Sequence, residues 1–83
     1  MTLLYFAWVR QKIGIGEETI RLPEGVATVR DLAHVLRARG GAFEDVFSDL
    51  QRLRAAVDQA HVGWDAPVSS AREVAFFPPV TGG

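Results

Sequence analysis

Residues 73–83 read Glu73-Val74-Ala75-Phe76-Phe77-Pro78-Pro79-Val80-Thr81-Gly82-Gly83, and this stretch decides the fold. Its apolar first half, residues 73–77, is rich in valine and phenylalanine, which predicts a strand. Two prolines then end the strand, because proline has no N–H to donate to a sheet. We therefore expect a folded domain over residues 1–77 and an extended, flexible tail over residues 78–83.

The expected tail differs from an ordinary frayed end, because it carries no charged side chain after Glu73. Pro78 and Pro79 favour an extended path that would carry the tip about 18 Å from the domain. Gly82 and Gly83 lack a Cβ, so their backbone can enter a slot too narrow for any other residue. The pattern indicates a reactive tip on a tether.

A second apolar stretch, residues 2–10, is nearly continuous and predicts a strand that is buried on both faces. Residues 11–17 contain Gly14 and Gly16, and we expect them to form a turn. Residues 18–22 alternate polar and apolar, so we expect a second strand and an N-terminal hairpin. The first and last strands are the most apolar, which makes both candidates for the centre of the sheet.

The clearest helix is predicted over residues 28–39, where apolar residues recur at helical spacing. These residues are Val29, Leu32, Ala33 and Leu36. Thr28 is the expected N-cap, and Asp31 stands where the acid of a capping box would. Gly40-Gly41 is expected to end the helix.

The remaining segments are shorter. Residues 42–51 predict a short helix, and residues 53–57 and 61–64 predict strands joined by a turn near Asp58-Gln59. Residues 68–72 are expected to form a polar loop. One main helix across one face of a mixed sheet is a compact solution for 83 residues, so the order predicts an α+β fold of the β-grasp type.

Composition argues against several classes of protein. The net charge of −1 gives no long-range attraction for nucleic acid or for an anionic membrane. No apolar run approaches the ~20 residues that span a bilayer, and no signal-peptide pattern is present, so we expect a cytoplasmic protein. Cysteine is absent, which excludes disulfide bonds and side-chain thiolate chemistry.

No side chain stands out as a catalyst. His34 and His61 are distant in sequence and have no acid at ligand spacing, so we expect no metal site and interpret both as structural background. Trp8 and Trp64 are expected in the core or at an interface. By elimination, the candidate group is the carboxylate of Gly83, which needs activation because an ionised carboxylate resists attack.

The ending at residues 73–83 resembles that of the MoaD family, the small sulfur-carrier subunits of molybdopterin synthase. Residues 3–10, together with Gly14, are similar to the first strand and turn of that family. Its middle strands resemble residues 53–59, Val62, Trp64-Asp65 and Pro67. The resemblance spans nearly the whole chain, and the ending is its most specific part.

The resemblance implies a ubiquitin-like β-grasp fold and a non-catalytic, sulfur-donating subunit whose active-site side chains lie on a partner. It implies that an activating enzyme of the E1 type, similar to MoeB, uses ATP to adenylate Gly83, and that a sulfur donor protein then supplies a thiocarboxylate. The chain itself is expected to bind no cofactor. The sulfur would pass to cyclic pyranopterin monophosphate in the large subunit, MoaE, to form molybdopterin. The residues expected to enter that active site are Pro78, Pro79, Val80, Thr81 and Gly82.

Partner binding is expected at Phe76 and Phe77, and we expect Phe77 and Val80 to be partly exposed. Two positions depart from the family pattern: Asp58 replaces a common asparagine, and residues 70–72 replace a more turn-like sequence. These departures put the loop geometry and the fit to a partner in question.

Three alternatives remain open from the sequence. The chain resembles, more distantly, carriers that serve thiamine or thionucleoside synthesis. It could also be a ubiquitin-like modifier that is joined to lysines through Gly83, or a β-grasp interaction module with an inert tail.

Overall fold

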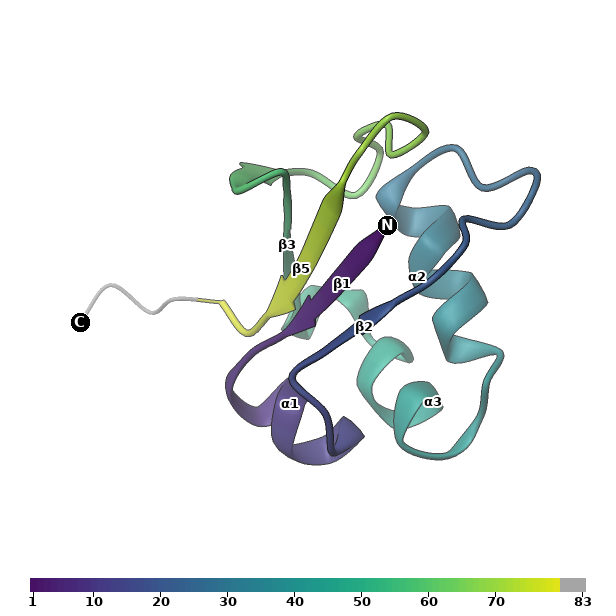
Figure 1. The fold of residues 1–83 in the computed structure, drawn as a ribbon. Helices are drawn as coiled ribbons and strands as arrows, with labels where there is room; N and C mark the ends of the chain where they lie inside the picture. Colours follow the sequence, from purple (N-terminus) through teal and green to yellow (C-terminus); the bar gives the residue numbers. More distant parts are fainter. Residues whose placement is uncertain (80–83) are drawn as a thin grey trace.

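The computed structural model describes residues 1–79, in which strands and helices share one small body (Figure 1). The strands are β1 (Thr2–Tyr5), β2 (Glu17–Thr19), β3 (Arg54–Val57), β4 (Ala60–Val62) and β5 (Glu73–Phe77). The helices are α1 (Ala7–Ile13), α2 (Val29–Arg37) and α3 (Gly41–Phe47), followed by a 3-10 turn, η1 (Leu50–Arg52). The last strand therefore has the bounds that its sequence predicted.

The described strands form one mixed sheet in the order β2-β1-β5-β3-β4. The pair β1 and β5 is parallel, with Leu3 opposite Val74 and Tyr5 opposite Phe76, and the other pairs are antiparallel. The strand β5 lies at the centre and β1 lies beside it, which confirms the expectation for the two most apolar strands. The backbone of these strands is paired on both sides, so their side chains alone meet the two faces of the sheet.

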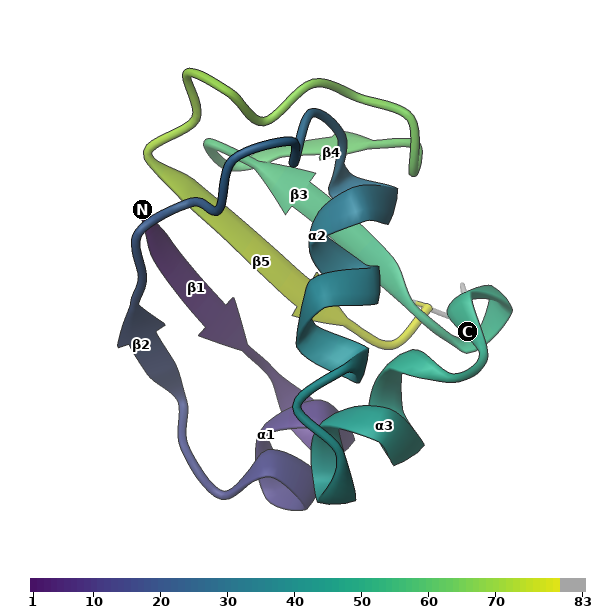
Figure 2. The same cartoon turned by 90° about the vertical axis from the view of Figure 1, so that its right-hand side faces the viewer.

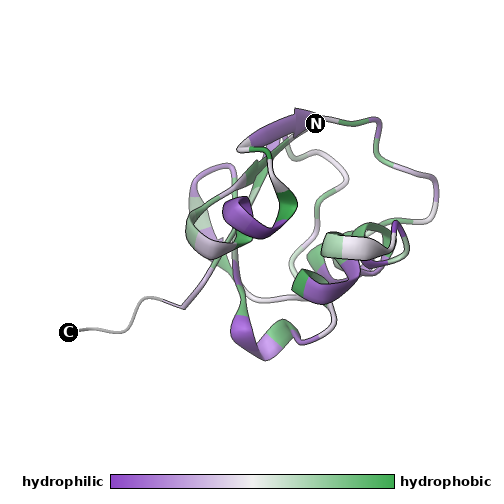
Figure 3. Cartoon of the chain, turned by 90° about the horizontal axis from the view of Figure 1, so that it is seen from below, coloured by the Kyte–Doolittle hydropathy of each residue, from purple (hydrophilic) through white to green (hydrophobic). Residues whose placement is uncertain are grey.

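The helices lie over one face of this sheet, with α2 running across it (Figure 2). The predicted apolar stripe of α2 is confirmed, because its four residues are all fully buried. They are Val29, Leu32, Ala33 and Leu36. They pack in one core with the inward side chains of the sheet, among them Leu3, Val74 and Phe76. Figure 3 shows hydrophilic and hydrophobic turns within the same helices, as expected when one side faces the core.

The start of α2 is fixed by the predicted capping box. The Thr28 hydroxyl accepts a hydrogen bond from the Asp31 backbone N–H at 3.1 Å, and the Asp31 carboxylate accepts one from the Thr28 N–H at 3.1 Å. The backbone N–H groups of Ala27 and Thr28, which donate to the Asp31 carboxylate, hold its pKa below the ordinary value. The helix ends at Arg37, and Gly40, with a φ of 78°, turns the chain into α3.

The prediction of one strand over residues 2–10 is wrong. The strand ends at Tyr5, Ala7 adopts a left-handed φ of 53°, and α1 follows immediately. The apolar residues of α1 serve a helical face, since Val9 is fully buried and Trp8 and Ile13 pack against the core. A continuous apolar run does not distinguish a buried strand from a strand followed by a buried helix.

Two further predictions change with α1. Residues 11–13 are helical rather than part of a turn, and the turn is confined to the segment after Gly14, whose φ is 93°. The strands β1 and β2 pair antiparallel as expected, but α1 connects them in place of a tight hairpin. The short helix predicted over residues 42–51 corresponds to α3, and α1 is the α-helix of the described residues that the sequence did not predict.

Candidate functional site

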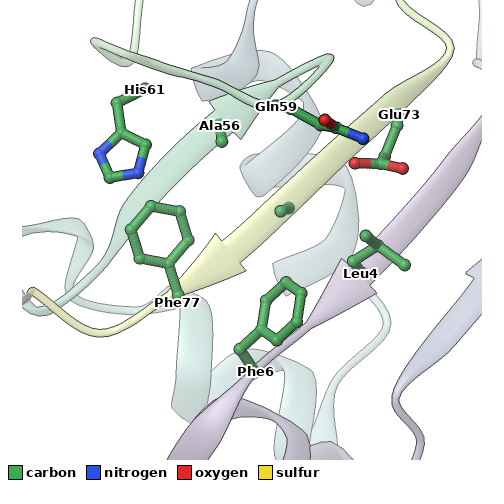
Figure 4. Close-up of a pocket in the computed structure, with 8 residues that line it drawn as sticks. Leu4, Phe6, Ala56, Gln59, His61, Glu73 and Phe77 are labelled. Carbon is green, nitrogen blue, oxygen red and sulfur yellow. The ribbon is translucent and has the colours of Figure 1, made fainter.

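The face of the sheet away from the helices carries an apolar surface. Side chains alternate across a strand, so Leu3 and Tyr5 point into the core while Leu4 and Phe6 point the other way. We call this surface the open face and define it by the residues that line a shallow pocket of about 320 Å³ (Figure 4). These residues are Leu4, Phe6, Ala56, Gln59, His61, Glu73, Ala75 and Phe77.

The open face meets the predicted tail at Phe77. This residue ends β5, is half-buried, and lies with its ring centroid 5.0 Å from that of His61. The half-buried Pro78 and Pro79 follow directly and are the last described residues. A chain leaving β5 therefore starts from the edge of an apolar surface.

Phe6 contributes the most exposed large side chain of this surface, with 47% of its area accessible. Its N–H donates to the Phe76 carbonyl at 3.2 Å, which prolongs the β1–β5 pairing by one residue. The left-handed turn at Ala7 then diverts the chain into α1 and leaves the Phe6 ring on the open face. A non-glycine residue in this region is strained, and such strain persists where the surrounding fold demands it.

The expectation that Phe76 contacts a partner is wrong for the folded chain. Its side chain is fully buried on the helix side of β5. The ring packs edge-on against Phe47 at 4.9 Å and stacks with Trp64 at 6.3 Å. Successive side chains of a strand point to opposite faces, so Phe76 and Phe77 cannot both belong to one surface.

The start of β5 is anchored by Asp58, one of the two departures from the family pattern. Its carboxylate accepts hydrogen bonds from the backbone N–H groups of Arg72 at 2.9 Å and Glu73 at 3.0 Å. Asp58 and Gln59 have φ values of 48° and 72° and form the predicted turn between β3 and β4. An asparagine Oδ1 would accept the same bonds, and both residue types tolerate this backbone, so the substitution keeps the loop geometry.

A polar cluster on the opposite side of β1 is structural. The Tyr5 hydroxyl donates to the Glu18 carboxylate at 2.7 Å, and Arg39 donates to both Glu18 oxygens at 2.9 Å. Burial raises the pKa of Tyr5 far above its ordinary value, and Glu18 raises it further, so the phenol stays protonated. These bonds join β1 and β2 to the segment after α2, where Arg39 also lies over the Phe43 ring.

The other sequence candidates show no further chemistry in residues 1–79. His34 is exposed on α2, and no group of three or more acidic or histidine side chains in this part of the chain could hold a metal ion. None of the helices described is long and apolar enough to cross a membrane. The predicted tail residues Val80, Thr81, Gly82 and Gly83 lie outside the described residues.

The sequence reading missed Leu4, Phe6 and His61 as surface residues of interest. The alternation of Leu3, Leu4, Tyr5 and Phe6 contained no polar residue to mark the exposed side, and His61 was interpreted as background. The pairing register of the strands is the information that identifies these surface residues. It places His61 opposite Ala56 and Leu4 opposite Ala75.

The sequence matches a known family and curated proteins over its full length. A model of the ThiS family matches residues 3–83. The molybdopterin synthase sulfur carrier subunit of Escherichia coli (strain K12) is 37% identical over 81 residues, which cover 98% of this chain and 96% of that protein. The subunit of the same name from Haemophilus influenzae is 31% identical over 83 residues, covering 100% of this chain and 99% of that protein.

Solved structures resemble the fold over nearly all of its length. A Pyrococcus furiosus structure described as molybdopterin converting factor, subunit 1, has a TM-score of 0.72 and 34% identity, with 95% of each chain covered. The crystal structure of SAMP1 from Haloferax volcanii has a TM-score of 0.73 and 24% identity, covering 100% of this chain and 98% of that one, which concerns the fold alone. The predicted ubiquitin-like β-grasp fold is confirmed.

Proposed function

The chain belongs to the ThiS family, and on that premise we propose that it is the sulfur-carrier subunit of a molybdopterin synthase. The names of its bacterial relatives support this pathway over thiamine or thionucleoside synthesis. The observation that carries the proposal is that β5 ends at Phe77, on the edge of the apolar open face, and that Pro78 and Pro79 follow directly. We therefore propose that a single partner binds both the open face and the predicted tail.

The group that carries sulfur in this proposal is the carboxylate of Gly83. An activating enzyme of the E1 type joins it to AMP from ATP and releases pyrophosphate. Sulfur delivered at the sulfide level by a donor protein then bonds to the acyl carbon as AMP leaves, which gives a thiocarboxylate, a better nucleophile than the carboxylate. Because the chain has no cysteine, the sulfur is held by the main-chain terminus instead of a side-chain thiol.

The large subunit, similar to MoaE, is the proposed occupant of the open face. Phe77, Phe6 and Leu4 would bury apolar area against it, each contributing in proportion to the surface removed from water. Docking there would direct residues 78–83 into the partner's active site, where the thiocarboxylate donates sulfur to cyclic pyranopterin monophosphate. The residues that catalyse this transfer belong to the partner.

The proposal is tested by intact mass after incubation with the activating enzyme of the same genome, ATP and a sulfur source. We expect a gain of about 16 Da, the difference between sulfur and oxygen, and conversion of cyclic pyranopterin monophosphate once the large subunit is added. Deleting Gly83 should abolish both signals while thermal unfolding stays unchanged. An active partner enzyme that produces no mass gain would refute the carrier function, and adducts on lysines would favour a protein modifier.

A graded control compares two glycine-to-alanine changes. Gly82→Ala adds a methyl group within the proposed tail. It should slow sulfur transfer, because the narrow active site of the large subunit would have to accommodate that methyl group. Gly63→Ala adds the same group in open space at an ordinary backbone conformation, and it should leave transfer unchanged. Equal effects of the two changes would contradict the role of the tail.

A further inference from the structure

Two titratable side chains, Glu73 and His61, line the apolar open face, and His61 is the one beside Phe77. His61 comes from β4 and lies opposite Ala56 of β3 in the register. Its ring is exposed and tilted by 46° against the Phe77 ring at a centroid distance of 5.0 Å. Figure 4 shows the imidazole beside Phe77, at the end of the pocket where β5 runs into the tail. A partner that covers Phe77 therefore covers His61 as well.

Two charged side chains on or beside this face, those of Glu73 and Arg54, form no ion pair with His61. Figure 4 shows the Glu73 carboxylate beside Gln59, at the other end of the pocket from His61. The Arg54 guanidinium, on the neighbouring strand β3, donates to the Leu53 carbonyl at 2.7 Å and the Gln51 carbonyl at 3.2 Å.

The turn that leads into β4 offers no counter-charge either. The Asp58 carboxylate accepts from the Arg72 and Glu73 N–H groups, and the exposed Arg72 lines a separate pocket with Asp58, Gln59 and Glu73. No ion pair involves His61 within residues 1–79. A positive charge on its ring would have water and the Phe77 ring beside it, and no ion-pair partner among the described residues.

We propose that His61 is a proton-sensitive specificity contact, and that docking of the large subunit requires its neutral imidazole; this rests on the proposed function. The neutral ring offers an apolar body that extends the Phe77 contact and one N–H for the partner. The charged ring would lose its water on docking against an apolar surface without gaining a counter-charge, which costs free energy.

The sign of the pH effect follows from proton linkage. If the complex favours the neutral imidazole, the free chain binds more protons than the complex, so acid favours dissociation. Affinity is then highest at pH values where the free imidazole is neutral, and it falls as the free imidazole gains a proton. Docking, and with it sulfur delivery, would weaken on mild acidification.

The test measures the dissociation constant between the full chain and the large subunit of the same genome at pH 7.5 and pH 5.5. We expect the affinity of the unmodified chain to weaken by about threefold to tenfold at the lower pH, because docking would then have to displace a proton from the imidazole. His61→Gln, which is polar but does not titrate, should lose this pH dependence. The matched control His34→Gln removes the exposed histidine of α2 and should keep it.

Each other outcome overturns a stated part of the inference. If the dissociation constant changes between pH 7.5 and pH 5.5 by the same factor for His61→Gln and for the unmodified chain, the pH dependence belongs to the partner. His61 would then be removed from the proposed interface. Tighter binding in acid would mean that the partner supplies a carboxylate to His61, contrary to the proposal. Absence of binding at both pH values, with the thiocarboxylate still formed, would refute docking at the open face itself. Circular dichroism of each variant at both pH values checks that the chain stays folded.

Discussion

Phe76 and Phe77 are neighbours in β5, yet they belong to two regions with different tasks. Phe76 is fully buried under the helices and packs against Phe47, whereas Phe77 lies half-buried on the open face beside His61. The same aromatic side chain thus stabilises the fold on one face and remains available to a partner on the other. The difference teaches that one strand can hold the domain together and also present the surface that we propose as the docking site.

The largest effect that would sharpen this comparison concerns stability. Phe76→Ala should lower the free energy of unfolding by about 3–5 kcal/mol, because it removes a large buried ring and leaves a cavity. Phe77→Ala should cost less than about 1.5 kcal/mol, since the ring is already partly in water. Urea titration followed by circular dichroism measures both, and Phe76→Leu serves if the alanine variant does not fold. Equal losses would break the distinction between the two faces.

The next effect concerns docking. Phe77→Asp should weaken binding to the large subunit by about tenfold to a hundredfold, because it places a charge where apolar area is buried. The control His34→Asp adds the same charge on α2, over the helix-covered face, and should leave the dissociation constant within about twofold. Calorimetry with the purified large subunit measures both. Unchanged affinity for Phe77→Asp would remove the open face from the interface.

A smaller effect is expected at the turn that anchors β5. Asp58→Ala removes the acceptor for two backbone N–H groups and places alanine in a left-handed conformation, so it should cost about 1–2 kcal/mol. Asp58→Asn keeps both the acceptor and the tolerance for that conformation, and should stay within about 0.5 kcal/mol of the unmodified chain. Chemical unfolding compares the two, and an alanine variant as stable as the asparagine one would show that the anchor is dispensable.

The smallest effect tests the strain next to Phe6. Ala7→Gly should leave stability unchanged or raise it by up to about 1 kcal/mol, because glycine adopts a φ of 53° without a steric cost. A matched change at an ordinary helical position of the same helix, Gln11→Gly, should destabilise by about 0.5–1 kcal/mol. Differential scanning calorimetry measures both. A loss for Ala7→Gly as large as for Gln11→Gly would mean that the turn is not strained.

The elements that could be predicted are those whose local pattern admits one solution. The helix α2 combines a four-residue apolar stripe with the Thr28–Asp31 capping box, and both operate within the helix itself. The strand β5 combines an apolar run with a proline stop. In contrast, residues 2–10 contain no polar or turn-forming residue at Phe6 and Ala7. The hydrophobic pattern therefore could not reveal that the strand ends there and a helix begins.

The candidate site divides in the same way. Its chemical part, the tail, stays a prediction from the residue types, because glycine and proline free or restrict the backbone wherever they occur. Its surface part could not be predicted, since Leu4, Phe6 and His61 become neighbours of Phe77 only through the pairing of β1, β3, β4 and β5. The register also corrected Phe76, which the sequence had placed with Phe77.

The sequence by itself determined an α+β chain with a central final strand and a capped helix, and it led to the prediction that the working group is a main-chain carboxylate. These follow from local chemistry: side-chain shape, backbone freedom and hydrogen bonds within a few residues. Only the tertiary structure decided which apolar side chains are core and which are surface, because that depends on which face of the sheet the helices cover. Contacts between strands distant in sequence carry this information, and no single segment contains it.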